Sequence, residues 1–203
     1  MSNDLNFYIN GEWVKSESNE TIDVINPANE EVIGQVTAGT KEDIDKAVCA
    51  ALDAFSSFQQ TTKAQRIELL KNVITEYEAR YNDFVQTISK EMGSPIWLSE
   101  AAQAKTGIKN IQETLDALES YEFERPEGDY TLIKEPIGVI GMITPWNWPM
   151  NQITTKVSAA LAAGCTMVLK PSEISPYCAM LLAEVFDKAG VPNGVFNIVT
   201  VSY

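Results

Sequence analysis

Three polar side chains follow the ends of two short apolar stretches in the sequence. Asn147 comes shortly after residues 139–144, and Lys170 and Glu173 come at the end of residues 166–169. In an open α/β sheet, ligands bind in the crevice beyond the carboxyl ends of the strands. If the two stretches are neighbouring strands, these three side chains are expected to face one ligand.

The amide of Asn147 could take part in carbonyl chemistry. A neutral amide beyond a strand end can donate a hydrogen bond to a carbonyl oxygen that gains negative charge, and such a donor is worth roughly 3 kcal/mol in acyl-transfer sites. The alternative is that Asn147 caps the helix that begins at Pro149, and the local sequence alone favours the cap. The two roles are compatible with each other.

Lys170 and Glu173 have the chemistry to hold a ribose. A carboxylate near the end of the second strand of a Rossmann-like fold accepts hydrogen bonds from the ribose hydroxyls of adenosine. Lys170 can donate to the same sugar. The charge of Glu173 would repel a 2′-phosphate, which favours NAD over NADP. The alternative is a surface ion pair worth at most about 1 kcal/mol.

A parallel β-α-β-α-β unit is predicted to position these residues. Residues 139–144 form an apolar run that is typical of a strand covered on both faces. Connections of helical length imply parallel strands with right-handed crossovers. No Gly-x-Gly-x-x-Gly follows the first strand, so a pyrophosphate must be bound in another way. The expected elements are strands over 139–144, 166–169 and 195–199 and helices over 149–163, stopped by Gly164, and from Ser175-Pro176 to Gly190.

Three β-hairpins are predicted outside this unit. Asn10-Gly11 between apolar arms is a strong hairpin signal, because both residues must adopt positive φ. Short strands over 22–25 and 32–36 form a second pair. Residues 121–135 alternate apolar and polar side chains and are expected to turn at Pro126-Glu127-Gly128. The exposed edge of this last hairpin could be covered by pairing between subunits, or it could be a surface hairpin with no partner.

The helices of the first half open with capping patterns at Thr40 and Thr62. From Thr62, apolar residues recur at spacings of three and four, which could indicate a coiled coil. Gly93 ends the pattern at the minimum length that a coiled coil needs. We therefore expect one long helix packed inside the domain. A third helix is expected to start at Ser94-Pro95.

Composition and charge narrow the function classes. The net charge of −13 disfavours nucleic acid, because affinity for phosphate depends on Lys and Arg. The start lacks the pattern of a signal peptide and no apolar run reaches membrane-spanning length, so no membrane is expected. With no histidine, a zinc site and a His-based triad are disfavoured. Three cysteines, Cys49, Cys165 and Cys178, fit a reducing cytoplasm and are expected to be packing residues.

Three motifs carry a resemblance to a known family. They are Thr-Pro-Trp-Asn-Trp-Pro at 144–149, Ala-Ala-Gly-Cys-Thr-Met-Val-Leu-Lys-Pro-Ser-Glu at 162–173 and Gly-Val-Pro-Asn-Gly-Val-Phe-Asn-Ile-Val at 190–199. In this order they resemble the NAD(P)-dependent aldehyde dehydrogenase superfamily. The resemblance covers nearly the whole chain and stops at Thr200.

The resemblance implies a fold and a division of the chain. The fold is α/β, with an incomplete Rossmann-variant parallel sheet, N-terminal β-hairpins, long helices and a projecting β-hairpin. Residues 1–120 would hold the N-terminal hairpins and helices of the cofactor-binding domain. Residues 121–135 would be an oligomerisation hairpin, and residues 136–203 would begin the nucleotide-binding sheet. The full-length form would be a homo-oligomer.

The resemblance also implies an activity and a set of site residues. The activity is NAD-dependent oxidation of a small-molecule aldehyde to a carboxylic acid, with NAD as the cofactor. Asn147 would be the oxyanion donor, and Trp148 and Gln152 would face the aldehyde tunnel. The residues implied for the cofactor are Ile143, Thr144, Pro145 and Trp146 along the groove and Lys170 and Glu173 on the adenosine ribose.

The nucleophilic cysteine and the base of such enzymes lie further downstream in the family than this chain extends. The last three residues also depart from the family pattern, so a truncation or a frameshift is expected, and the chain alone is expected to be inactive. One alternative is a semialdehyde or acylating dehydrogenase of the same superfamily. Another is a non-catalytic nucleotide-binding remnant, or an assembly partner that uses residues 121–135.

Overall fold

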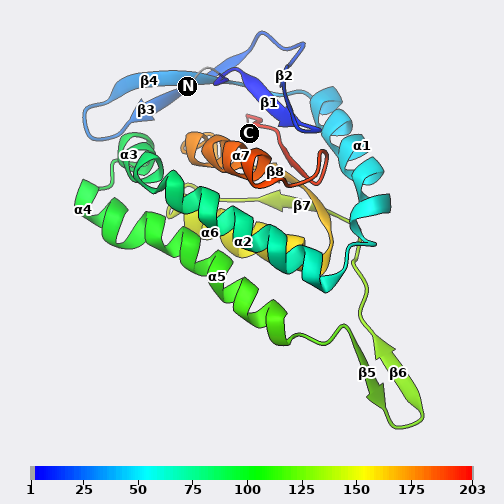
Figure 1. Ribbon diagram of the computed structural model, residues 1–203. Coiled ribbons are helices and arrows are strands. Elements are labelled where there is room, and N and C mark those ends of the chain that lie inside the picture. Colours follow the sequence, from blue (N-terminus) through cyan, green and yellow to red (C-terminus); the bar gives the residue numbers. More distant parts are fainter. Residues whose placement is uncertain (1–2, 203) are drawn as a thin grey trace.

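The computed structural model describes residues 3–202 and contains a mixed five-stranded sheet as its centre (Figure 1). The strand order is β2-β1-β9-β8-β7. β7 and β8 are parallel, β8 and β9 are parallel, and the N-terminal hairpin adds two antiparallel strands beside β9. The strands are β1 (Asn6–Ile9), β2 (Glu12–Lys15), β7 (Val139–Ile143), β8 (Thr166–Lys170) and β9 (Phe196–Ile198). The predicted α/β class and the parallel β-α-β-α-β unit are confirmed.

Two crossover helices connect the parallel strands. α6 (Pro149–Ala163) and α7 (Tyr177–Ala189) both end at a glycine in the left-handed conformation, Gly164 and Gly190. Both ends agree with the prediction, because glycine adopts positive φ without a Cβ clash. α1 (Lys41–Phe58) packs on the other side of the parallel strands, and α2 and α5 form an outer layer on α6.

The first parallel strand differs from its prediction. Within residues 3–202, β7 is an edge strand, and Met142 is the one buried residue among its five. Ile143 at its end is 70% exposed. The expectation of a strand covered on both faces is therefore wrong for β7, whereas β8 is buried along most of its length. The apolar run of β7 is covered only where α1 and α6 reach it.

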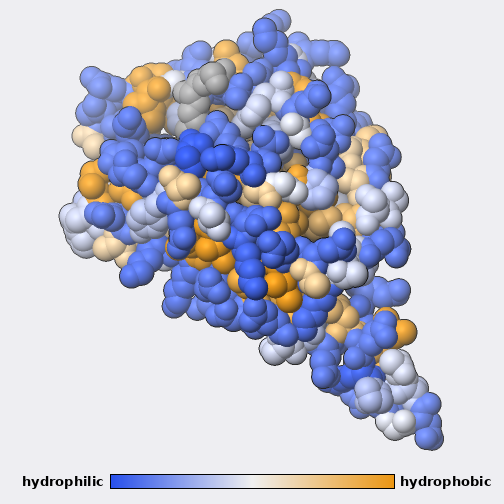
Figure 2. All heavy atoms as spheres, viewed as in Figure 1, coloured by the Kyte–Doolittle hydropathy of each residue, from blue (hydrophilic) through white to orange (hydrophobic). Residues whose placement is uncertain are grey.

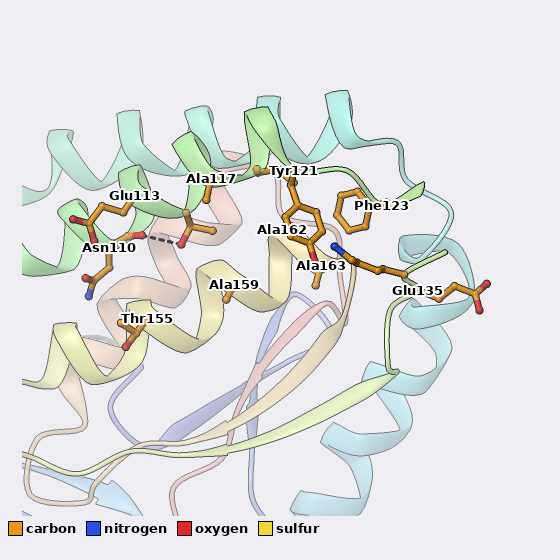
Figure 3. Close-up of a pocket in the computed structure, with 13 residues that line it drawn as sticks. Asn110, Glu113, Ala117, Tyr121, Phe123, Glu135, Thr155, Ala159, Ala162 and Ala163 are labelled. Atoms are coloured by element: carbon orange, nitrogen blue, oxygen red, sulfur yellow. Dashed lines mark hydrogen bonds between the residues drawn. The ribbon is translucent and has the colours of Figure 1, made fainter. Parts of the chain in front are cut away.

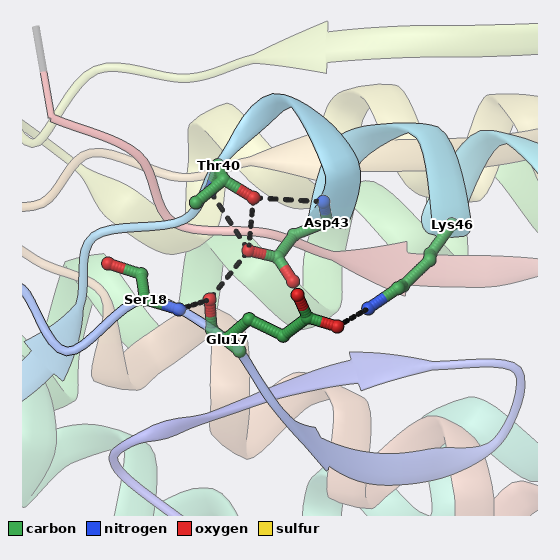
Figure 4. Close-up of polar contacts among 6 residues, drawn as sticks. Glu17, Ser18, Thr40, Asp43 and Lys46 are labelled. Carbon is green, nitrogen blue, oxygen red and sulfur yellow. Dashed lines mark hydrogen bonds and ion pairs between the residues drawn. The ribbon is translucent and has the colours of Figure 1, made fainter.

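Two capping boxes open the first helices as predicted. The Thr40 hydroxyl accepts from the backbone N–H of Asp43, and the Asp43 carboxylate accepts from the N–H of Thr40. Figure 4 shows this cap and the neighbouring ion pair of Lys46 with Glu17 at 3.6 Å. Thr62 forms the same reciprocal arrangement at the start of α2. Each box satisfies N–H groups that a helix start leaves without partners.

The long helix predicted after Thr62 is two helices. α2 (Lys63–Ala79) and α3 (Tyr81–Met92) are separated by Arg80, whose φ of −106° and ψ of 12° are not helical. Arg80 forms ion pairs with Asp83 and, at 3.1 Å, with Glu184. The rings of Tyr77 and Phe84 stack across the break at 4.2 Å. Tertiary contacts thus override the continuous apolar spacing.

The third helix also differs from the single element expected. Pro95 occupies the N-cap position of α4 (Ile96–Leu98), not the first helical position. A π-helical segment, η1 (Ser99–Ala104), follows and continues into α5 (Lys105–Ser120). The predicted start near Ser94-Pro95 is therefore displaced by one residue, and the helix is interrupted before α5.

Two hairpins lie outside the main sheet. β3 (Thr21–Asn26) pairs with β4 (Glu31–Thr37), as expected. β5 (Glu124–Glu127) and β6 (Tyr130–Ile133) form the projecting hairpin, which extends away from the body in Figure 1. Its turn was misplaced in the prediction. The turn consists of Gly128 and Asp129, and Gly128 adopts a φ of +64°. Such a two-residue connection needs positive φ, which glycine supplies.

The core lies between the sheet and the helices α2, α5, α6 and α7. Cys165 and Cys178 are buried in it, as predicted, but Cys49 is exposed on α1, so its expected packing role is wrong. Figure 2 shows a mostly hydrophilic face with hydrophobic residues gathered in its middle. No helix within residues 3–202 has the length and apolar character that crossing a membrane requires.

Candidate functional site

The carboxyl ends of β7 and β8 bring the predicted site residues to one edge of the sheet. Ile143 lies opposite Lys170 in the parallel register. Beyond this pair, the N–H of Thr144 donates to the carbonyl oxygen of Lys170 at 3.2 Å. The loops that follow are also joined, because the hydroxyl of Ser175 donates to the carbonyl oxygen of Trp146 at 3.4 Å. The two predicted groups therefore lie at one edge of the sheet, where open α/β sheets bind ligands in a crevice.

Lys170 and Glu173 form an ion pair at the end of β8. Their Nζ and Oε2 atoms are 3.0 Å apart, and the side chains are only 15% and 19% exposed. The surface-pair alternative therefore does not describe them well, because a partly buried pair is less screened than an exposed one. Oε1 of Glu173 accepts no hydrogen bond from residues 3–202. One carboxylate oxygen thus stays available for a hydroxyl donor.

Asn147 does not cap the helix that follows it. The N-cap of α6 is Trp148, and it forms no side-chain cap hydrogen bond within residues 3–202. The side chain of Asn147 is exposed and has no hydrogen bond to any residue within 3–202. Trp148 adopts a φ of +69°, a left-handed conformation that is costly for a bulky residue. Strain of this kind is concentrated at functional sites.

The remaining predicted cofactor residues line the same crevice with different exposure. Ile143, Pro145 and Trp146 are exposed, which leaves apolar surface beside the strand ends. Exposed apolar surface of this kind is typical of a binding site. Thr144 is 1% exposed, and its Oγ1 is a buried atom with no hydrogen-bond partner. A buried hydroxyl without a partner costs about 1–3 kcal/mol.

Gln152 lies in the first turn of α6, one turn after Trp148. Its backbone N–H donates to the carbonyl oxygen of Trp148 at 3.0 Å, and its own carbonyl oxygen accepts from Nζ of Lys156 at 3.0 Å. The side chain is half-buried. Gln152 therefore follows Asn147 and Trp148 along the same helix start, where the aldehyde residues were predicted.

A mostly apolar groove lies elsewhere on the molecule. It has a volume of about 490 Å³ and lies between α5, α6 and the base of the projecting hairpin (Figure 3). Small residues such as Ala117 and Ala159 line it, with Tyr121 and Phe123 at one end. None of the predicted site residues belongs to it. The predicted site residues are at the strand ends, so the candidate site is there and not in this groove.

Sequence reasoning missed three residues that shape the crevice. Ser172 Oγ accepts from the N–H of Ile174 at 3.3 Å, and Ser175 holds the Trp146 carbonyl. Ser-Pro at a helix start was read only as a boundary, although a serine in such a turn often bonds locally. Glu91 contacts the same region from α3. No local pattern could reveal that contact, because its partners are 86 and 87 residues away.

Known proteins match this chain over nearly its whole length. The model of the aldehyde dehydrogenase family matches residues 13–202. A protein of Staphylococcus aureus (strain USA300), provisionally described as an aldehyde dehydrogenase, is 55% identical over 192 residues. That match covers 95% of this chain and 40% of the relative. The chain therefore spans about 40% of the length of the curated relatives it matches.

Solved structures match in the same way. A mutant of aldehyde dehydrogenase C of Pseudomonas syringae, in complex with NAD+ and octanal, has a TM-score of 0.97 and 42% identity, covering 99% of this chain and 41% of that one. An aldehyde dehydrogenase of Bartonella henselae has a TM-score of 0.96 and 44% identity, covering 98% and 43%. An NADP-dependent enzyme of E. coli has a TM-score of 0.91 and 36% identity, covering 100% and 43%. These matches confirm the resemblance, and the chain belongs to the aldehyde dehydrogenase family.

Proposed function

We propose that this chain is the cofactor-binding part of an enzyme that oxidises an aldehyde to a carboxylic acid with NAD. The observation that carries the proposal is the Lys170–Glu173 pair of 3.0 Å, one strand away from the loop of Asn147. Ligands of open α/β sheets bind at such an edge. The Pseudomonas syringae relative in complex with NAD+ and octanal supports the same choice of ligands.

The residues at the crevice fit an adenosine ribose. Glu173 keeps one carboxylate oxygen without a donor, and Thr144 keeps a buried hydroxyl without a partner. Lys170 would donate to the sugar, and Ile143, Pro145 and Trp146 would cover the cofactor with apolar surface. NAD, when bound, would supply the acceptor for the hydride of the aldehyde. A 2′-phosphate would meet the charge of Glu173, so we propose NAD and not NADP.

Asn147 would act on the substrate carbonyl. Its amide has no partner within residues 3–202, so it can donate to the oxygen of an aldehyde that is attacked at carbon. The strained backbone of Trp148 keeps this donor from turning into a cap. Trp148 and Gln152, on the same helix start, would contact the rest of the aldehyde.

The chain does not place a thiol beside Asn147. Cys165 and Cys178 are buried, and burial raises the pKa of the Cys178 thiol. Cys49 is exposed on α1, on the other side of the sheet. A thiolate is the nucleophile of cysteine chemistry. We therefore propose that the chain alone has no turnover. Sustained NADH absorbance on incubation with NAD and several aldehydes would contradict this.

The projecting hairpin is proposed as an oligomerisation arm of the full-length enzyme. Among the described residues, β5 and β6 pair only with each other, and Tyr130 and Ile133 are exposed on them. A two-stranded hairpin is marginally stable by itself, and a partner strand would cover its edges. A cytoplasmic location belongs to the same proposal and is supported by three free cysteines.

Calorimetric titration with NAD and NADP tests the cofactor assignment. The wild-type chain is expected to bind NAD more tightly than NADP. Glu173→Gln is expected to lower the affinity for NAD by about tenfold, because a charge-assisted bond to the ribose is lost. The difference in affinity between NAD and NADP is expected to become smaller. Glu113→Gln is the matched control, since Glu113 pairs with Lys109 at 3.3 Å on the exposed face of α5. Equal NAD affinity in the wild type and Glu173→Gln would contradict the assignment.

A further inference from the structure

Glu91 is a fully buried carboxylate that the proposed chemistry does not use. It lies near the end of α3 with 0% of its surface exposed. Its Oε2 accepts from the backbone N–H of Tyr177 at 2.7 Å, and its Oε1 accepts from the N–H of Cys178 at 3.1 Å. No cation within residues 3–202 forms a salt bridge with it. Its partners are therefore the backbone at the start of α7 and the thiol of Cys178.

These two N–H groups are the first of α7. The helix begins at Tyr177, and its N-cap residue, Pro176, supplies no side-chain hydrogen bond. The next two N–H groups, of Ala179 and Met180, already bond to the carbonyl oxygen of Pro176. Without Glu91, the amides of Tyr177 and Cys178 would be buried without partners. The carboxyl group of Glu91 also faces the positive end of the helix dipole, which favours its ionised form and opposes the effect of burial.

The start of α7 is continuous with the cofactor crevice. Residues 171–176 connect β8 to α7 and carry Glu173. Within this loop the N–H of Ser175 donates to the carbonyl oxygen of Ser172 at 3.2 Å, and the hydroxyl of Ser175 reaches the carbonyl oxygen of Trp146. Figure 1 shows α3 beside the start of α7. A loop that is tied at both ends holds its side chains in one arrangement.

We propose that Glu91 is a positioning residue: from α3 it fixes the first turn of α7 and, through residues 171–176, the places of Glu173 and the Trp146 carbonyl. This inference rests on the proposed function for the role of Glu173 as a ribose ligand. The clamp itself is a property of the chain without cofactor. Its loss therefore has two separate consequences, one for the loop and one for ligand binding.

Hydrogen–deuterium exchange of the whole chain without ligand tests the clamp. Glu91→Gln keeps the size of the side chain but can accept at only one oxygen. We expect amides of residues 171–178 to exchange about tenfold faster, with the last turns of α7 unchanged. Glu91→Asp, which keeps the charge on a shorter side chain, is expected to show a smaller increase. It also serves as the second variant if Glu91→Gln does not fold.

Glu184→Gln is the control for a general weakening of α7. Glu184 lies on the same helix and pairs with Arg80 at 3.1 Å, far from the first turn. It is expected to leave residues 171–178 at the wild-type exchange rate. Unchanged exchange of residues 171–178 in Glu91→Gln would overturn the proposal. A uniform increase along all of α7 would also overturn it, because that pattern indicates a plain loss of stability.

A double-mutant cycle separates this inference from the proposed function. We expect Glu91→Gln to raise the Kd for NAD about fivefold in the wild-type background and to have no further effect after Glu173→Gln. Additive effects would overturn the coupling between the two residues. A wild-type chain that binds no NAD would instead refute the proposed function, and the exchange experiment would still decide whether Glu91 fixes the loop.

Discussion

The backbone N–H of Thr144 donates to the carbonyl oxygen of Lys170 at 3.2 Å. This bond continues the parallel pairing of β7 and β8 past its last residue pair, Ile143 and Lys170. Asn147 and Glu173 each follow the bonded residues by three positions, so they leave the sheet from adjacent points. The backbone pairing therefore starts the loops of the proposed carbonyl donor and of the proposed ribose ligand at the same edge of the sheet.

Thr144→Val is expected to change stability and cofactor affinity in opposite directions. The hydroxyl of Thr144 is buried without a partner, so replacing it by a methyl group of the same shape removes a desolvation cost. We expect the free energy of unfolding to rise by about 1 kcal/mol in urea titrations. If the cofactor bonds to this hydroxyl, the same substitution weakens NAD binding by about tenfold.

Thr154→Val is the control for Thr144→Val. The Thr154 hydroxyl is also buried, but it donates to the carbonyl oxygen of Met150 at 2.7 Å and accepts from the amide of Asn110 at 3.1 Å. Removing the hydroxyl takes one hydrogen-bond partner from the Asn110 amide. The free energy of unfolding is therefore expected to fall by about 1–2 kcal/mol. A Thr144→Val variant that is destabilised as much as Thr154→Val would show that its hydroxyl is already satisfied.

The capping box of α2 should contribute measurably to stability. The N–H of Gln65 donates to Oγ1 of Thr62 at 3.2 Å, and the N–H of Thr62 donates to Oε1 of Gln65 at 2.8 Å. Thr62→Ala is expected to lower the free energy of unfolding by about 1 kcal/mol. Thr75→Ala, in the middle of the same helix, should leave stability unchanged or raise it slightly, because alanine has the higher helix propensity. Equal effects of the two substitutions would argue against the cap.

Gly164→Ala and Gly190→Ala form a matched pair at helix ends. Both glycines have positive φ, +80° and +83°. A Cβ at Gly190 would meet no atom within 4 Å, so only backbone strain of about 1–2 kcal/mol is expected. At Gly164 the Cβ would lie 2.3 Å from the buried guanidinium of Arg66. Gly164→Ala is therefore expected to lose more stability in thermal unfolding than Gly190→Ala. The difference between the two losses is the cost of displacing Arg66. Similar losses would show that Arg66 moves freely.

The sequence predicted those parts of the fold that depend on local chemistry. Asn10-Gly11, Thr40, Thr62, Gly164 and Gly190 each act through their own backbone or the next turn, and all five predictions agree with the structure. The prediction of a ligand site at the strand ends also came from local signals, and the structure brings the ends of β7 and β8 together. An apolar run followed by a polar residue marks where a parallel strand ends.

The features that were missed depend on distant contacts. An apolar run has the same composition in a central strand and in β7, which is at the edge because β8 has β9 on its other side. The break at Arg80 contains neither glycine nor proline and depends on Glu184 from α7. Glu91 resembles any other charged residue of a helix until α7 is placed against it. Only the folded chain supplies such neighbours.

The pH dependence of stability should carry the signature of Glu91. Burial raises the pKa of this carboxyl group to about 7 from an ordinary value of 4.5, although hydrogen bonds from Cys178 and from the backbone lower it in part. Between these two pH values the folded chain holds a proton that the unfolded chain releases. Glu91 therefore contributes stability that is fully present below pH 4.5 and is lost as the pH rises through 7.

Comparison with Glu91→Gln isolates this contribution. The titratable groups that face Glu91 are the Cys178 thiol and the Tyr177 hydroxyl, and burial raises the pKa of both, so they stay protonated at neutral pH. From pH 5 to pH 8, the free energy of unfolding measured in urea is expected to fall by about 2–3 kcal/mol more for the wild type than for the variant. Parallel stability curves for the two proteins would mean that Glu91 keeps an ordinary pKa in the folded chain. Its carboxylate would then be stabilised by the helix start of α7 strongly enough to offset its burial.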